Sequence, residues 1–205
     1  WLWPDADPKR GWERLKVTMS FLRAKLRAGG AMEDTIETIG QSYLLRRDAV
    51  SVDADVFDSL VVAGWGLLKK GNHREARTRF EEAESLYRGE YLEDEPYADW
   101  CAEERERLRE MHLELLAGMA RCYAEDGLLL EASQVCRKAL VNDPCRESFL
   151  RALLENLVNL GRPDAARAQF AAWRRRLEEE YHLQPTHETL QVHRRLLGEQ
   201  SGETR

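Results

Sequence analysis

The stretch GLLLEASQVC at residues 127–136 is followed 34 residues later by GRPDAARAQF at residues 161–170. Both stretches begin with glycine, place an alanine five residues on, and place a cysteine or a phenylalanine four residues after that alanine. An earlier copy starts at Gly71, which precedes Gly127 by one repeat plus an insertion of 22 residues. Small residues let two antiparallel helices approach closely, and the glycine permits the tight turn between them. The repeat therefore predicts stacked helical hairpins.

The repeat length of 34 residues is the period of tetratricopeptide (TPR) repeats, in which helix pairs stack into a curved array. Tyr123 and Pro144 fall where that pattern has an aromatic residue and a terminating proline. The chain after Val52 has a helical pattern throughout and ends in a last helix near residues 186–197. We therefore predict a TPR-like domain of helical repeats over residues 51–205.

The first fifty residues have a different pattern. Residues 1–11 are rich in proline, glycine and aspartate and are predicted to form a loop. Apolar residues at three- and four-residue spacing predict a helix over residues 12–28, which Gly29-Gly30 would end. Residues 35–46 are β-branched and aromatic around Gly40-Gln41-Ser42, a pattern that predicts two short strands in a hairpin. The predicted fold class is mainly all-α, with a TPR-like domain after a short β-hairpin.

The 205 residues carry a net charge of −6, which by itself argues against a nucleic-acid binder. The charge is unevenly spread along the chain. Residues 1–50 hold nine basic and seven acidic residues, a net charge of +2, so the remainder carries −8. Any nucleic-acid contact is therefore expected near the N-terminus, and the acidic remainder suits a protein partner better than a phosphate backbone.

Two parts of the chain resemble a known family of regulators. The stretch LWPDADP at residues 2–8, with the predicted helix that follows, resembles the winged-helix segment of the Streptomyces antibiotic regulatory protein type. The stretch LYRGEYL at residues 86–92, together with residues 181–189, is similar to the bacterial transcriptional activator domain of that family. The resemblance implies a transcriptional regulator. In it, residues 1–50 would be the C-terminal half of an OmpR-like winged helix and the rest the activator domain.

The resemblance makes residues 12–28 a recognition helix and residues 35–47 the wing of a DNA-binding domain. A recognition helix presents one exposed face to the major groove, where side chains reach base edges and phosphates. The predicted DNA-binding residues are Arg14, Lys16, Val17, Thr18, Ser20, Phe21 and Lys25, with Gln41 and Ser42 in the turn. Phe21 and Ile39 occupy positions where the family often has a basic residue. Few arginine side chains are therefore available to read DNA bases directly. The opening half of a winged helix has no counterpart in the sequence, so the apolar face of the helix is expected to need other packing.

A TPR-like array offers a concave surface to peptides or neighbouring domains. The candidate contact residues are the aromatic residues that fall outside the repeat pattern, Tyr91, Tyr97, Trp100 and Trp173. Alternatively, most of these aromatic residues fill gaps in the packing around the insertion, at about residues 87–107. The expected partners are double-stranded promoter DNA, RNA polymerase or a sensor domain, and a second copy of the chain in a homodimer.

Two other interpretations stay open on the sequence. One is a protein-binding adaptor or signalling module whose DNA-reading helix has degenerated, which Phe21, Ile39 and the acidic balance favour. The other is a piece of a larger signalling protein with a separate ATPase or ligand-binding portion. A salt-dependent affinity for DNA would separate a regulator from an adaptor, because phosphate contacts release counterions.

The chain is predicted not to be an enzyme. It lacks the phosphate-binding, dinucleotide-binding and nucleophile-elbow patterns, and no cofactor is expected. Its four cysteines form no C-x-x-C pair and, with five scattered histidines, offer no metal-ligand spacing. They are expected to be buried free thiols in a reducing cytoplasm. No apolar run approaches the length of a membrane helix.

Overall fold

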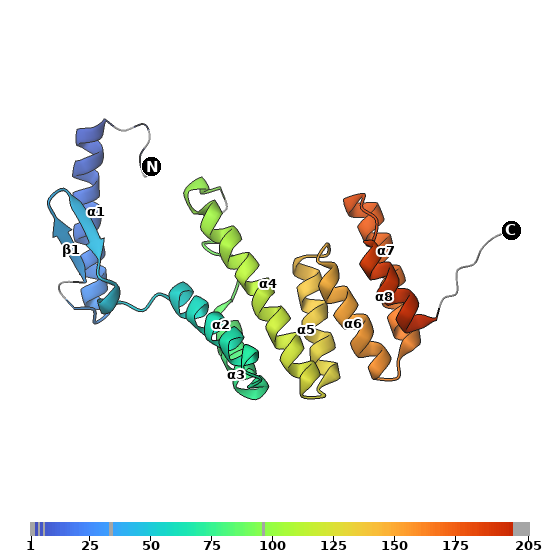
Figure 1. The fold of residues 1–205 in the computed structure, drawn as a ribbon. Helices are drawn as coiled ribbons and strands as arrows, with labels where there is room; N and C mark the ends of the chain where they lie inside the picture. Colours follow the sequence, from blue (N-terminus) through green and yellow to red (C-terminus); the bar gives the residue numbers. More distant parts are fainter. Residues whose placement is uncertain (1–2, 4, 6, 33–34, 96, 199–205) are drawn as a thin grey trace.

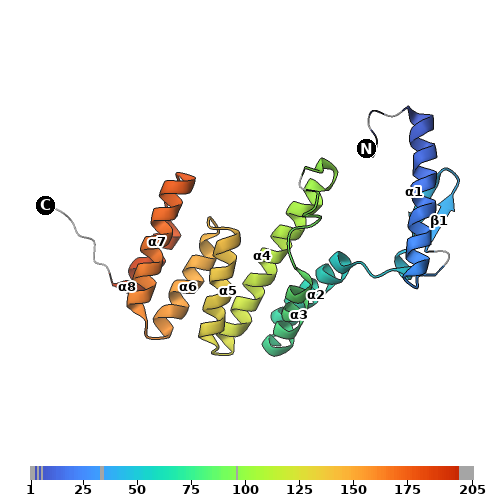
Figure 2. The ribbon, with the colours of Figure 1, turned by 180° about the vertical axis from the view of Figure 1, so that it is seen from behind.

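The computed structural model describes residues 3, 5, 7–32, 35–95 and 97–198. These residues form two parts (Figures 1 and 2). The N-terminal unit consists of the helix α1 (Pro8–Ala28) and a hairpin of the strands β1 (Ile36–Ile39) and β2 (Ser42–Leu45). The helical array consists of α2 to α8, and a connecting segment that contains the 3-10 turn η1 (Arg47–Ala49) joins it to the hairpin. The predicted fold class, mainly all-α with a short β-hairpin before TPR-like repeats, is confirmed.

The helix α1 begins earlier than the sequence predicted. The carboxylate of Asp7 accepts a hydrogen bond from the Arg10 backbone N–H at 3.3 Å, which caps the first turn. Pro8 follows at the first helical position, where the missing N–H of proline costs nothing. The loop predicted for residues 1–11 is therefore wrong from Pro8 onward, because a proline that starts a helix resembles a loop signal in the sequence. The pair Gly29-Gly30 ends α1 as predicted, with Gly30 at a φ of +90°.

The hairpin agrees with the prediction. The strands β1 and β2 pair antiparallel, with Ile36 opposite Leu45 and Ile39 opposite Ser42. Two residues, Gly40 and Gln41, therefore make the turn. Only the glycine has a positive φ, +60°, and a type II′ turn favours glycine at that first central position.

The array is a row of helices in which each helix packs against the next one in the chain (Figure 1). Its members are α2 (Asp53–Lys69), α3 (His73–Leu86), α4 (Ala102–Glu125), α5 (Leu129–Asn142), α6 (Glu147–Asn159), α7 (Pro163–Tyr181) and α8 (His187–Leu197). Gly71, Gly127 and Gly161 occupy the turns inside the three helix pairs, with φ of +80°, +75° and +72°. The alanines five residues after them are fully buried. The spacing that suggested the repeat thus marks equivalent positions in three helical hairpins.

Two glycines of neighbouring helices pack closely against Phe80 of α3. A Cβ atom added to Gly64 would lie 2.6 Å from Cε1 of the ring, and one added to Gly118 would lie 2.4 Å from its Cζ. The two glycines belong to α2 and α4, so both neighbouring helices leave room for one buried aromatic side chain. The ring fixes how closely α2, α3 and α4 approach one another.

The insertion between the first two repeats contributes to two elements. Residues 87–95, 97 and 98 leave the array as a loop, and the 3-10 turn η2 (Asp99–Cys101) brings the chain back. The remainder lengthens the next helix, because α4 has 24 residues where its repeat counterpart α6 has 13. The loop and the long first turns of α4 form a structure beside α2 and α3 that the repeat itself does not require.

Candidate functional site

The outer face of α1 carries the predicted DNA-binding residues. No residue of α1 is buried, and the half-buried side chains Trp12, Leu15, Met19 and Leu26 follow one another at helical spacing. All seven predicted contact residues of the helix are exposed. At 3.6 residues per turn, four of them share the face opposite the half-buried stripe, namely Arg14, Val17, Phe21 and Lys25. The structure therefore brings these four together, leaves Thr18 and Ser20 at the two edges of that face, and places Lys16 beside the half-buried stripe.

Arg23 holds α1 against the hairpin. Its guanidinium donates to the carbonyl oxygen of Ile36 from Nε at 3.1 Å and from Nη2 at 2.7 Å, and Nη2 also donates to Oγ1 of Thr38 at 2.8 Å. The same group lies 5.4 Å from the centre of the Tyr43 ring, which packs 5.8 Å from the ring of Trp12. This role was not predicted from the sequence. The signal was available, because Arg23 continues the half-buried stripe of α1 at the spacing of Met19 and Leu26.

The predicted DNA-binding side chains of α1 differ in how free they are to meet a partner. Nζ of Lys16 pairs with Glu13 at 3.0 Å and lies 5.5 Å from the Trp12 ring, while Oγ1 of Thr18 donates to the Arg14 carbonyl oxygen at 3.0 Å. Arg14 makes no ion pair within the described part of the chain. Two apolar side chains separate these polar groups, with Val17 71% and Phe21 64% exposed. The face can meet phosphates at its basic positions and apolar surface, such as a thymine methyl, at its centre.

The hairpin places its two predicted DNA-binding residues at the tip. Gln41 lies in the turn and Ser42 starts β2, and both are exposed. Ile39, at the end of β1, is 57% exposed. The tip thus offers polar groups and one apolar side chain, and it has no cation of its own.

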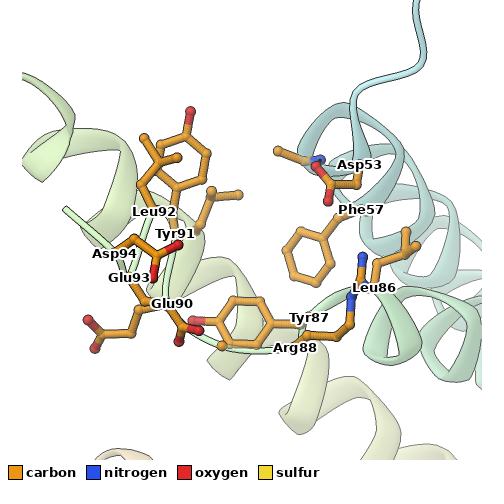
Figure 3. Close-up of a pocket in the computed structure, with 13 residues that line it drawn as sticks. Asp53, Phe57, Leu86, Tyr87, Arg88, Glu90, Tyr91, Leu92, Glu93 and Asp94 are labelled. Atoms are coloured by element: carbon orange, nitrogen blue, oxygen red, sulfur yellow. Dashed lines mark hydrogen bonds between the residues drawn. The ribbon is translucent and has the colours of Figure 1, made fainter. Parts of the chain in front are cut away.

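A second candidate site lies where the insertion meets the array (Figure 3). A cavity of about 340 Å³ opens between the start of α2, the end of α3, residues 87–94 and Leu108 of α4. We call it the loop pocket. The rings of Phe57, Tyr87 and Tyr91 contribute to its lining, and acidic side chains of the loop lie across the cavity from α2.

One arginine of α4 organises the loop. Arg105 donates from Nε to the carbonyl oxygen of Tyr91 at 3.0 Å, and from Nη2 to those of Leu92 at 3.4 Å and Glu95 at 3.1 Å. Leu92 has a φ of +52°, a backbone conformation that costs energy for a residue with a branched side chain. The contacts with Arg105 offset that cost and give the loop pocket a fixed wall.

A polar network that contains the buried His112 lies behind the loop pocket. The ring of Tyr87 stacks on His112 with centroids 3.8 Å apart, and Nε2 of His112 lies 2.9 Å from Oε2 of Glu84. Lys138 of α5 pairs with the other oxygen of Glu84. Burial opposes the charged form of Glu84, but the hydrogen bonds from His112 and Lys138 outweigh it and hold its pKa below the ordinary value. The network links α3, α4 and α5 to one wall of the pocket.

The four predicted partner-binding aromatics fall into three environments. Tyr91 is half-buried and lines the loop pocket, while Tyr97 and Trp100 project from the insertion with 94% and 59% of their surfaces exposed. Trp173 is only 5% exposed, and its indole N–H donates to the Pro144 carbonyl oxygen at 2.8 Å. Its selection as a contact residue does not fit this structure, because its ring fills the core of the last helix pair.

The cysteines and acidic residues provide no reactive or metal-binding centre among the residues described. The four cysteines are free thiols as predicted, although Cys145 is only half-buried. Burial raises the pKa of Cys122 to about 11 and that of Cys136 to about 12, so these two groups remain thiols at neutral pH. No group of three or more potential ligands is placed to hold a metal ion in the described ranges. None of the described helices is both long and apolar enough to span a membrane.

Comparison with known proteins finds a family match for the helical array and a relative that aligns with most of the chain. Residues 52–197, which contain the whole helical array, match the family model of the bacterial transcriptional activator domain. Over 197 residues, which is 95% of this chain, the sequence is 27% identical to the regulatory protein AfsR of Streptomyces griseus. The chain spans only 19% of the length of that relative.

Proposed function

We propose, because this chain belongs to the bacterial transcriptional activator domain family, that it regulates transcription by contacting promoter DNA through its N-terminal unit and a protein through its helical array. In this proposal residues 1–50 act as the C-terminal half of a winged helix. The observation that carries it is the exposed outer face of α1, which Arg23 holds in a fixed position beside the hairpin. A regulator of this kind would act in the bacterial cytoplasm.

The charge of the two parts supports this division of roles. Residues 1–50 carry a net charge of +2 and the remainder carries −8. A positive surface attracts the phosphate backbone and an acidic surface repels it, so DNA would approach the N-terminal unit. The acidic array would then be free to contact RNA polymerase, a sensor domain or a second copy of the chain.

Selection from random duplex DNA, at low and at moderate salt, tests the DNA-binding part. We expect enrichment of a repeated or palindromic site and an affinity that falls as salt rises. The variant Arg14→Ala with Lys25→Ala should weaken binding and reduce the salt slope by about one for each phosphate that the variant no longer neutralises. The pair Lys16→Ala and Thr18→Ala should impair selection of the site. The variant Arg174→Ala with Arg175→Ala, which removes two exposed cations from α7, is the matched control.

A second candidate function is a protein-binding adaptor without DNA affinity. The observation that favours it is the apolar centre of the outer face of α1, where Val17 and Phe21 are exposed side by side. Such a face suits a protein surface as well as a thymine methyl. Absence of enriched DNA at either salt concentration would reject the regulator proposal and leave the adaptor.

A further inference from the structure

The loop pocket carries more negative charge than the described residues compensate. Four carboxylates line it, those of Asp53, Glu90, Glu93 and Asp94, and none of them makes an ion pair within the described part of the chain. Arg88 is the one cation in the lining. Arg105 lies nearby, but its guanidinium is engaged with the backbone carbonyls of the loop. The pocket is therefore a place where a positive charge would be stabilised.

Aromatic side chains form much of the remaining wall. The rings of Phe57 and Tyr87 lie 5.7 Å apart, and Figure 3 shows Phe57 on α2 and Tyr87 next to Glu90. Tyr91 contributes a third ring from the loop itself. Burial, and next the charge of Glu90, raises the pKa of the Tyr87 hydroxyl above its ordinary value. Aromatic faces attract cations through their quadrupole, and they also cover the apolar stem of a long side chain.

The arrangement selects for one class of ligand. The excess of carboxylates disfavours anions such as phosphate. A metal ion would need several ligand atoms converging on one point, and the described acidic residues form no such group. An organic cation with an apolar stem satisfies both kinds of wall, and a cavity of about 340 Å³ lies within the usual size of ligand pockets.

We propose that the loop pocket binds an arginine or lysine side chain from a segment of a partner protein. The inference rests on the partner-binding half of the proposed function and is independent of DNA contact by the N-terminal unit. The charge of the array argues for a partner segment as the source, because −8 on this part of the chain would attract a basic segment to the entrance of the pocket.

The test uses the whole 205-residue chain and calorimetric titration with a capped five-residue peptide that has one arginine between two leucines. The matched peptide replaces arginine by citrulline, which has nearly the same shape and no charge. The double variant Glu90→Gln with Asp94→Asn removes two charges from the pocket. The variant Glu125→Gln with Glu131→Gln removes two exposed charges far from the pocket. Glu125 ends α4, roughly 25 Å along the helix axis from Leu108, and Glu131 lies in the first turn of α5.

We expect saturable binding of the arginine peptide, at least about tenfold weaker binding of the citrulline peptide, and a similar loss with Glu90→Gln and Asp94→Asn. The control variant should bind like the parent chain. Equal binding of both peptides, or equal loss in the control variant, would overturn the inference.

A further titration with agmatine, a free guanidinium on a short stem, tests whether the bound cation belongs to a protein segment or to a small molecule. An affinity for agmatine equal to that for the peptide would overturn the assignment to a protein segment. DNA binding measured on the same pocket variant should be unchanged, so failure of peptide binding alone leaves the DNA-binding proposal standing.

Discussion

Two phenylalanines show how differently the two parts of the molecule are held together. Phe80 is fully buried between Gly64 of α2 and Gly118 of α4. Phe21 lies on α1 with 64% of its surface exposed, on a helix that buries none of its residues. The array is therefore stabilised by removal of apolar surface from water, the main favourable contribution to folding. The N-terminal unit has little burial and depends on a few directed contacts.

This difference in burial has a consequence for local stability. Segments with few buried contacts open with a smaller free energy than a packed core does. In the N-terminal unit, the contacts that join helix and hairpin centre on Arg23, Trp12 and Tyr43. We therefore expect the hairpin to exchange its amide protons faster than the helices of the array, and each part to respond to its own substitutions.

The largest effect is expected for Phe80→Ala. Truncation removes a buried ring and leaves a cavity between two glycines, which have no side chains to fill it. We expect a loss of about 3–5 kcal/mol in the free energy of unfolding. Urea unfolding followed by helical circular dichroism measures it. A loss below about 1 kcal/mol would show that α2, α3 and α4 do not depend on this ring, and the contrast with Phe21 would then have no basis.

The next effect is expected for Arg23→Ala. The substitution removes two hydrogen bonds from a charged donor to Ile36 and one to Thr38. We expect the hairpin to lose about 1.5–3 kcal/mol of local stability, since hydrogen bonds to charged groups contribute in that range. Faster hydrogen exchange of the β1 and β2 amides would report it, with the array unchanged. Arg14→Ala removes an exposed arginine from the same helix, and it should leave hairpin exchange as in the parent chain.

The repeat was predictable from the sequence because its determinants are local. A glycine at positive φ and an alanine five residues later recur in three helical hairpins. The same repeat could have corrected the assignment of Trp173. It lies 34 residues after Ala139, a fully buried position, and so belongs to the core by its place in the pattern. Its aromatic ring instead suggested a residue outside the pattern.

The loop pocket could not be predicted in the same way. Its wall depends on contacts between Arg105 and backbone carbonyls 10 to 14 residues earlier, and carbonyls have no sequence signature. The sequence did indicate an insertion with aromatic residues that included Tyr91. It could not show that Asp53 and Phe57 of α2 lie on the other side of the same cavity, because that proximity arises from packing between helices.

A smaller effect, confined to the array, is expected from pH. The hydrogen bonds of Glu84 with His112 and Lys138 hold its folded pKa below the ordinary 4.5, despite opposing burial. Its contribution to stability is therefore fully present above pH 4.5 and is lost as pH falls through the folded pKa. In Glu84→Gln, the fall in unfolding free energy over that acidic window should be shallower than in the parent chain. Urea unfolding at several pH values measures the difference, and identical slopes would contradict it.

The smallest effect is expected for Phe21→Ala. The ring is exposed, and its one ring contact within the described residues is with Lys25, whose Nζ lies 5.5 Å from the ring centre. The unfolding free energy of the array should change by less than about 0.5 kcal/mol, as for most exposed positions. The urea unfolding curve that reports Phe80→Ala measures this as well. A loss above about 1 kcal/mol would mean that this ring is buried against another part of the molecule in solution. The N-terminal unit would then share the hydrophobic stabilisation of the array, and the outer face of α1 would be closed to DNA.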